Sequence, residues 1–295
     1  MTHWFITGAT GFIGQELIRC VLAQGDRVTG LTRKVTPKHN SRVNWVTDVQ
    51  DCPQDIDVIV NLAGEGIADR RWSAERKQAL RDSRIALTQA LVERAASTQV
   101  RQVISASAVG FYGAAGVVDE SAQQGHGWAA QLCRDWEAVA QEFAAPTAII
   151  RLGVVLGPGG FLNRTLPPFS LGLGGPIGNG AQGFSWIHRQ DVIRLILWMV
   201  EHQKTGVYNA CGPQASTNKQ MAQALGAAVN RPAFLPAPGW VLKAVFGQMA
   251  EELLLSGQQA LPTRALEEGF EFAHPTLLGA MREAVMSKRS GSTAG

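Results

Sequence analysis

The chain has 295 residues, of which 45% are hydrophobic and 17% are charged, and its formal net charge is +3 at pH 7. A chain of this length buries a large core, as one α/β domain or as a domain with an appended lobe. The small and scattered positive charge predicts no nucleic-acid partner. No apolar run approaches the roughly 20 residues that cross a bilayer, so we expect no membrane partner.

The cysteines and the N-terminus indicate the compartment. Cys20, Cys52, Cys133 and Cys211 are far apart in sequence and show no spacing typical of a metal site. This pattern predicts neither a disulfide framework nor a metal site. The chain begins MTHWFITGATG, without a basic-then-apolar leader. We therefore predict a cytoplasmic protein, and the sequence leaves a homodimer open.

Strand and helix patterns alternate through the first two-thirds of the chain. Short apolar runs rich in β-branched residues predict strands at 3–7, 27–31, 43–46, 58–62, 102–105 and 148–152. Helical patterns occupy 12–23, 74–96 and 128–143. This alternation predicts an α/β fold with a Rossmann-type doubly wound parallel sheet.

The pattern changes at Gly153. Two Gly-rich stretches, 153–160 and 170–183, predict loops. Sheet-like pieces at 184–187 and 206–210 flank a helix at 191–201, and further helices are predicted at 218–229, 240–255 and 277–286. We expect residues 1–152 and 184–212 to form an NADP-binding domain, and residues 153–183 and 213–287 to form a smaller, mainly helical C-terminal lobe. Residues 288–295 are polar and small, which predicts a disordered tail.

Three glycines, Gly8, Gly11 and Gly14, stand between the first strand and the first helix in FITGATGFIGQEL. This spacing lets backbone N–H groups approach a pyrophosphate, and the N-terminus of the following helix favours its negative charge. A tight turn without a ligand is the alternative. The position of the motif at the first strand of an α/β chain favours dinucleotide binding.

The end of the second predicted strand distinguishes NAD from NADP. NAD-binding folds usually place an acidic residue there, about 20 positions after the glycines, on the ribose hydroxyls. This chain has Thr32, Arg33 and Lys34 instead. The guanidinium of Arg33 can pair with a 2′-phosphate, so the sequence predicts NADP(H). A solvated loop arginine is the alternative interpretation.

Further motifs carry a resemblance to a known family. NLAG at 61–64 and SASAVGFYG at 105–113 each follow a predicted strand, and AGEGIADRRW, RLGVVLGPGG, LGLGGPIGNG, WIHRQDV and YNACGP occur around and after them. With TGATGFIG, these motifs resemble the extended short-chain dehydrogenase/reductases. The match is to the atypical branch labelled "epimerase family", which is similar to nucleoside-diphosphate-sugar epimerases and ends in a small domain of unassigned role. The resemblance covers nearly the whole chain.

The resemblance implies contacts to NADP(H). The glycine loop would bind the pyrophosphate, Thr32 and Arg33 would bind the 2′-phosphate, and Asp48 would approach the adenine. Arg84 would contact a phosphate or a ribose. The implied cofactor-binding set is Gly8, Thr10, Gly11, Phe12, Ile13, Gly14, Thr32, Arg33, Asp48, Leu62, Ala63, Gly64 and Arg84. The alternatives are that Asp48 caps a helix or turn and that Arg84 belongs to a solvated face.

Catalysis in the family uses a tyrosine and a lysine in Y-x-x-x-K, where the ammonium lowers the phenol's pKa from about 10. This chain has two tyrosines, and neither is followed by a lysine four residues later. Register against Glu137 puts Ala129 at the tyrosine position and Cys133 at the lysine position. The usual proton relay is absent, and two small side chains there predict open space beside the nicotinamide.

Ser107 and Tyr112 are the remaining catalytic candidates. Ser107 matches the family's substrate-orienting serine, and Tyr112 lies in a loop that lines the family's active site. Packing or hydrogen bonding in the loop is at least as good a role for this phenol. Cys133 is predicted to be a buried, inert thiol. His126 and His188 are acid–base candidates by residue type alone, and for His188 we expect a hydrogen bond in the core.

Two functions remain open, because loss of general acid–base help costs about 10²–10⁴ in rate without abolishing hydride transfer. The first is an NADP(H)-dependent oxidoreductase or epimerase-like enzyme that uses Ser107 and Tyr112 on an unknown small-molecule substrate. The second is a catalytically silent NADP(H)-binding protein that senses redox state or regulates a partner.

Overall fold

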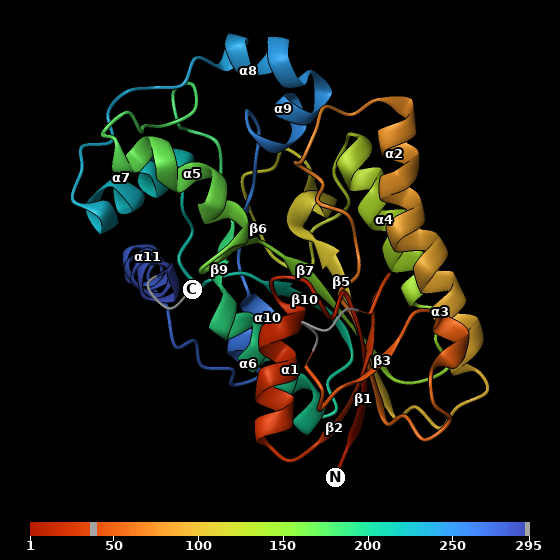
Figure 1. The fold of residues 1–295 in the computed structure, drawn as a ribbon. Coiled ribbons are helices and arrows are strands. Elements are labelled where there is room, and N and C mark those ends of the chain that lie inside the picture. Colours follow the sequence, from red (N-terminus) through yellow and green to blue (C-terminus); the bar gives the residue numbers. More distant parts are fainter. Residues whose placement is uncertain (36–39, 293–295) are drawn as a thin grey trace.

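The computed structural model describes residues 1–35 and 40–292 (Figure 1). Its centre is a seven-stranded parallel sheet with the strand order β10-β7-β5-β4-β1-β2-β3, so the predicted doubly wound fold is confirmed. The order reverses between β1 and β4, which is where ligands bind in such sheets. The strands are β1 (His3–Thr7), β2 (Arg27–Leu31), β3 (Asn44–Val46), β4 (Val58–Asn61), β5 (Gln102–Ala108), β7 (Thr147–Leu152) and β10 (Gly206–Ala210).

Helices cover both faces of this sheet (Figure 1). One layer contains α1 (Gly14–Ala23) and α6 (Arg189–Glu201), and the other contains α2 (Ala74–Arg81), α3 (Leu87–Ala95) and α4 (Trp128–Ala140). Leu17 of α1 and Ile193 of α6 pack on strand residues such as Ile6 and Ile150, which are all buried. The predicted helix 74–96 is interrupted by a π-helical turn (Asp82–Ala86) between α2 and α3.

A smaller lobe has its own apolar core. Its helices α5 (Gly160–Ser170), α7 (Asn218–Val229) and α11 (Leu277–Ser292) pack against a two-stranded sheet of β8 (Val154–Leu156) and β9 (Trp186–His188). The remaining elements are α8 (Gly239–Phe246), α9 (Gln248–Leu253), α10 (Thr263–Glu267) and the pair β6 (Val117–Val118) and β11 (Gln259–Ala260). The C-terminal region is therefore mainly helical, as expected.

Two local expectations were wrong. Residues 153–160 were predicted to be a loop, but Val154–Leu156 form β8 because they pair with β9, a strand about 30 residues later in the sequence. Residues 288–292 were predicted to belong to a disordered tail, but they continue α11, and the Lys288 ammonium donates to Asn163 Oδ1 at 2.6 Å. Residues 293–295 lie outside the described residues. The division of the chain into two domains stays a prediction.

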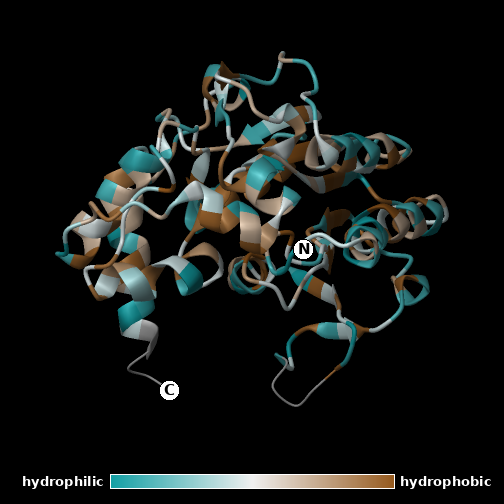
Figure 2. Cartoon of the chain, turned by 90° about the horizontal axis from the view of Figure 1, so that it is seen from above, coloured by the Kyte–Doolittle hydropathy of each residue, from teal (hydrophilic) through white to brown (hydrophobic). Residues whose placement is uncertain are grey.

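Figure 2 shows hydrophilic residues on much of the periphery and hydrophobic segments toward the middle of the molecule. This distribution agrees with the buried apolar clusters on either side of the main sheet. Within residues 1–35 and 40–292, no helix is both long and apolar enough to cross a membrane.

Candidate functional site

The glycine loop lies at the carboxyl end of β1 and presses against the end of β4. Gly8 has a positive φ of 63°, and a Cβ placed on it would lie 2.6 Å from the Leu62 carbonyl oxygen. A Cβ on Gly14 would overlap the carbonyl oxygen of Gly8. These close approaches leave the loop's backbone open to a pyrophosphate, with the N-terminus of α1 behind it. The structure thus brings the loop together with Leu62 and Ala63 at the switch point.

The other loop residues have different surroundings. Phe12 packs toward the smaller lobe, because its ring lies close to Gly157 and Gly159 and the Arg189 guanidinium stacks 4.9 Å from its centroid. Ile13 packs on the main core. Thr10 is exposed, and its carbonyl oxygen accepts a hydrogen bond from Gln15 Nε2 at 2.9 Å.

Thr32 and Arg33 follow β2 at the same edge of the sheet. The Thr32 backbone N–H donates to the Val46 carbonyl oxygen at 3.0 Å, which fixes the chain here, while the side chain of Arg33 is exposed. Asp48 caps a short 3-10 helix (Val49–Asp51) by accepting from the Gln50 backbone N–H at 2.9 Å. That cap is the alternative role that the sequence left open for Asp48.

Arg84 lies in the π-helical turn and is not part of a solvated face. Its Nη2 donates to the Glu65 carbonyl oxygen at 2.8 Å, and its Cζ lies 5.4 Å from the Trp136 ring centroid. A Cβ on Gly64 would lie 3.0 Å from this Cζ. Burial lowers the pKa of Arg84, and in the described part of the chain it forms no ion pair. Its Nη1 donates to the Leu80 carbonyl oxygen and to Ser83 Oγ, at 3.2 and 3.3 Å, so its partners are neutral oxygens. A cation therefore stands next to the end of β4.

The two catalytic candidates belong to one buried network. Ser107 Oγ donates to Glu137 Oε1 at 2.6 Å, and Arg151 donates to both oxygens of this carboxylate, at 2.9 and 2.7 Å. Arg151 Nη1 also donates to the Tyr112 hydroxyl at 2.9 Å, and this hydroxyl donates to Asn209 Oδ1 at 2.7 Å. The network joins β5, α4, β7 and β10 behind the site.

These bonds bear directly on catalysis. Tyr112 is 2% exposed, its proton is already donated to Asn209, and burial raises its pKa. Ser107 is also 2% exposed and donates its proton to Glu137. In this arrangement neither hydroxyl has a proton free for a substrate. The packing and hydrogen-bonding role left open for Tyr112 is the one that the structure displays.

The surroundings of Ala129 and Cys133 bear on the open space that the sequence predicts beside them. Both residues are buried, with exposed fractions of 5% and 4%. Ala129 packs in a cluster with Trp72, Leu132 and Met249. Burial raises the pKa of Cys133 to about 12, so this residue is a neutral thiol, as expected. Both side chains face Gly110, where a Cβ would lie 3.8 Å from Ala129 Cβ and 3.7 Å from Cys133 Sγ, and the Ala129 backbone N–H donates to Glu252 of α9 at 2.8 Å. Open space beside a bound nicotinamide stays a prediction.

The two histidines differ in environment. His126 is exposed in the loop before α4. His188 is buried, its Nδ1 accepts from the Gln190 backbone N–H at 3.3 Å, and its Nε2 faces the Glu283 carboxylate. Burial lowers the pKa of His188, so the neutral ring carries its proton on Nε2.

His188, His274 and Glu283 bring potential metal-ligating atoms within 4.8 Å of one another. A metal ion would need the lone pair of His188 Nε2, whereas the bond from Gln190 places the proton on that nitrogen. The contacts therefore favour a close pairing of His188 with the Glu283 carboxylate, between β9 and α11, over a metal site.

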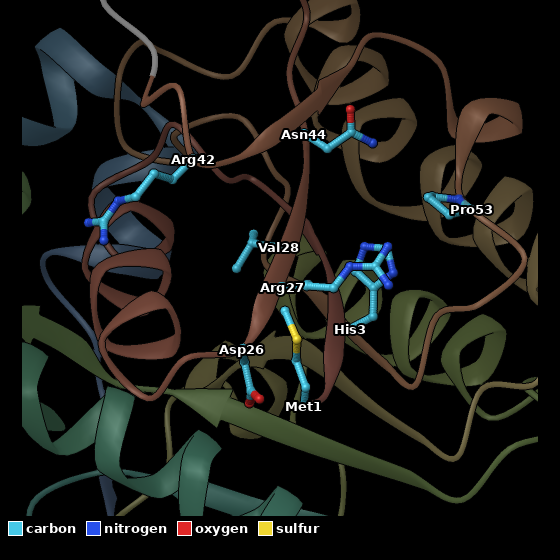
Figure 3. A pocket seen from close by; sticks show the side chains of 8 residues that line it. All are labelled: Met1, His3, Asp26, Arg27, Val28, Arg42, Asn44 and Pro53. Carbon is cyan, nitrogen blue, oxygen red and sulfur yellow. The ribbon is translucent and has the colours of Figure 1, made fainter.

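Two surface hollows adjoin the main sheet. One, with a volume of about 340 Å³, lies at the amino ends of β1 and β2. Figure 3 shows His3, Asp26 and Arg27 among the side chains that line it. Since doubly wound sheets bind ligands at the carboxyl ends of their strands, we do not assign it to the cofactor. The other, of about 260 Å³, adjoins the glycine loop at Thr10 and Gln15.

Comparisons with known proteins agree with this geometry. Residues 4–211 match the NAD dependent epimerase/dehydratase family, and residues 237–284 match a domain of unknown function, DUF1731. An epimerase family protein of Mycobacterium bovis is 40% identical over 283 residues, covering 92% of this chain and 94% of the relative. Human epimerase family protein SDR39U1 is 37% identical over 293 residues, covering 95% of this chain and 98% of the relative.

Two solved structures are similar in fold. The crystal structure of human SDR39U1 (isoform 2) with NADPH has a TM-score of 0.89 and 34% identity, and the match covers 97% of this chain and 99% of that one. UDP-glucuronic acid 4-epimerase from Bacillus cereus, in complex with UDP-glucuronic acid and NAD, has a TM-score of 0.79 and 21% identity over 98% of this chain and 99% of that one. The second likeness shows the fold alone.

Proposed function

The chain belongs to the NAD dependent epimerase/dehydratase family, and on this premise we propose that it binds NADP(H) at the carboxyl edge of its main sheet. The observation that carries the proposal is the close approach of the glycine loop to the end of β4. After β2, the exposed Arg33 stands where NAD-binding folds usually have an acidic residue. The human relative, 34% identical, was crystallised with NADPH, which supports the same cofactor here.

Different residues at this edge would bind different parts of the cofactor. The backbone N–H groups between Gly8 and Gly14 would hold the pyrophosphate, and Thr32 and Arg33 would hold the 2′-phosphate. Leu62, Ala63 and Gly64 would line the cofactor near its ribose. Arg84, a largely buried cation without a carboxylate partner among the described residues, would bind a phosphate or ribose oxygen there. When bound, NADP(H) supplies or accepts a hydride.

We further propose that the protein is an oxidoreductase or epimerase-like enzyme acting on a small molecule. The family match and the retained framework around β5 and α4 support this proposal. The hydrogen bonds of Ser107 and Tyr112 favour a positioning role for both, in which they hold β5 and the following loop through Glu137 and Arg151. The proton for reduction would then come from water or from the substrate itself.

A second candidate function is a catalytically silent NADP(H)-binding protein that senses redox state or regulates a partner. One observation favours it specifically: the place of the family's tyrosine is packed with apolar side chains, and the neighbouring hydroxyls are bonded within the protein.

Isothermal titration calorimetry with NADPH and NADH tests the cofactor proposal. The wild type should bind NADPH at least about tenfold more tightly, because one charge-assisted phosphate contact contributes about 1.5–3 kcal/mol. Arg33→Gln should remove most of this preference. Arg27→Gln, at the opposite end of β2, is the matched control and should retain it. Equal affinities of the wild type for the two dinucleotides would contradict the proposal.

Hydride exchange separates the two candidate functions. Purified protein is incubated with NADPH deuterated at the nicotinamide C4 and with a panel of carbonyl and nucleotide-sugar substrates, and deuterium in the products is measured by mass spectrometry. Transfer above the protein-free rate supports an enzyme. Binding of NADPH without transfer across the panel supports the silent protein.

A further inference from the structure

Helix α4 begins without a cap of its own. Gly127, which precedes it, has a φ of 105° and no side chain that could accept a hydrogen bond. The backbone N–H groups of Trp128 and Ala129 donate instead to the Glu252 carboxylate, at 3.2 and 2.8 Å. Glu252 lies on α9, within the residues that match the domain of unknown function. A residue about 120 positions later therefore caps the helix on which the family carries its tyrosine and lysine.

Apolar and polar contacts hold α9 in this place. Met249 is 2% exposed and packs with Ala129, Leu132 and Trp72. Next to it, Gln248 Oε1 accepts from the Lys77 ammonium of α2 at 2.8 Å. Figure 1 shows α9 beside the end of the layer that α2 and α4 form. Helix α9 is thus fixed on the helical layer that contains α2 and α4.

The direction in which helical side chains point relates α9 to the position of the missing tyrosine. Cβ atoms point toward the N-terminus of their own helix, so a large side chain at position 129, in the first turn of α4, would extend past the start of the helix. The Glu252 carboxylate lies at that end of the helix, where it accepts from the Ala129 backbone N–H, and Met249 belongs to the same buried apolar cluster as Ala129.

We propose that α9 has replaced the missing phenol and seals the nicotinamide side of the site. This inference rests on the proposed binding of NADP(H). It gives the C-terminal segment, including the domain of unknown function, a specific role: Glu252 fixes α9 on α4, and Met249 closes the gap beside Ala129.

The seal excludes water and provides no proton. Glu252 Oε1 accepts from Trp128 and from Gln248 Nε2 at 2.7 Å, and Oε2 accepts from Ala129, so both carboxylate oxygens are engaged within the protein. Met249 is apolar. A nicotinamide bound next to this wall would be shielded from solvent on that side.

Acrylamide quenching of the fluorescence of bound NADPH measures this shielding. Glu252→Ala and Met249→Ala should each raise the quenching constant about threefold or more, because they loosen α9 locally without unfolding the protein. Affinity for 2′,5′-ADP, which lacks the nicotinamide half, should be unchanged. Glu252→Gln keeps one acceptor oxygen and should lie between. Glu251→Ala removes an exposed neighbour that pairs with Lys243, and it is the matched control. Wild-type quenching in both Glu252→Ala and Met249→Ala would overturn the proposal.

A second experiment needs no cofactor, so it decides the inference even if the wild type fails to bind NADPH. Ala129→Tyr places a phenol in the space that α9 occupies. Amide hydrogen exchange in residues 248–253 should become about tenfold faster, as expected for loss of a helix cap and its neighbouring contacts. Ala138→Tyr, on the exposed face of α4, should leave that exchange unchanged. Unaltered exchange in Ala129→Tyr would show that the space is open and the proposal wrong.

Discussion

Replacing Glu137 with glutamine leaves the Arg151 guanidinium in the core without its carboxylate. In the wild type, hydrogen bonds of 2.9 and 2.7 Å join the two side chains, each 6% exposed. Breaking a buried ion pair by removing one partner costs about 3–5 kcal/mol, because an uncompensated charge stays behind. An unfolding entropy of about 2.1 cal/mol/K per residue gives roughly 0.6 kcal/mol/K for this chain, so the Tm should fall by about 5–8 °C.

Differential scanning calorimetry at pH 7 measures this change. The control is Glu142→Gln, the same substitution at an exposed residue just after α4. Glu137→Leu combined with Arg151→Met should destabilise less than Glu137→Gln alone, since both charges leave the core together. Tyr112→Phe loses only hydrogen bonds and should cost about 1–3 kcal/mol. A Tm of Glu137→Gln equal to that of the control would refute the assignment of these residues to a structural network.

Gly14→Ala should abolish NADPH binding in calorimetry, because its Cβ would overlap the Gly8 carbonyl oxygen, and retained affinity would show that the loop adapts. Titration of the folded protein with a thiol reagent at pH 8 should label the half-buried Cys20 before Cys133, whose pKa burial raises to about 12; labelling of Cys133 first would contradict its burial. Burial lowers the pKa of His188 below its ordinary 6.5, so the unfolded chain takes up the proton first and stability is lost as the pH falls below 6.5. His188→Asn should make the free energy of unfolding less dependent on pH between 6.5 and 5, and an unchanged slope would argue against this assignment.

Strands of the main sheet could be predicted closely from the sequence. Strands buried on both faces read as short apolar runs, and the predicted ranges 3–7 and 27–31 coincide with β1 and β2. Strand β8 could not be predicted in this way, because three residues next to a Gly-rich stretch become a strand only when β9 pairs with them. Local patterns report local preferences, and this pairing is a long-range contact.

In the candidate site, too, features that depend on local sequence could be predicted, and features that depend on long-range contacts could not. The glycine loop is local, since the close approach at Gly8 and Gly14 depends on residues within one turn and on the adjacent strand. The buried network joins several elements through Glu137 and Arg151. The sequence could therefore name Ser107 and Tyr112 as candidates without revealing that their protons are already donated. For Arg84, the choice between a solvated face and a ligand contact depended on its burial, which helical periodicity alone did not give.

Positions 129 and 133, where the family has its tyrosine and lysine, show that the size of a side chain does not by itself reveal the space around it. Small side chains at 129 and 133 suggest a cavity, but truncating a buried aromatic side chain without refilling costs about 3–5 kcal/mol. A chain that keeps its core packed must fill such a volume, and in the proposed seal Met249 of α9, which shares a buried apolar cluster with Ala129, contributes to the filling. Had the space stayed open, water could have donated the proton where the phenol normally does. Because it is closed, an enzyme with this architecture has to receive the proton from another direction, either from the substrate itself or from solvent on the side away from α9.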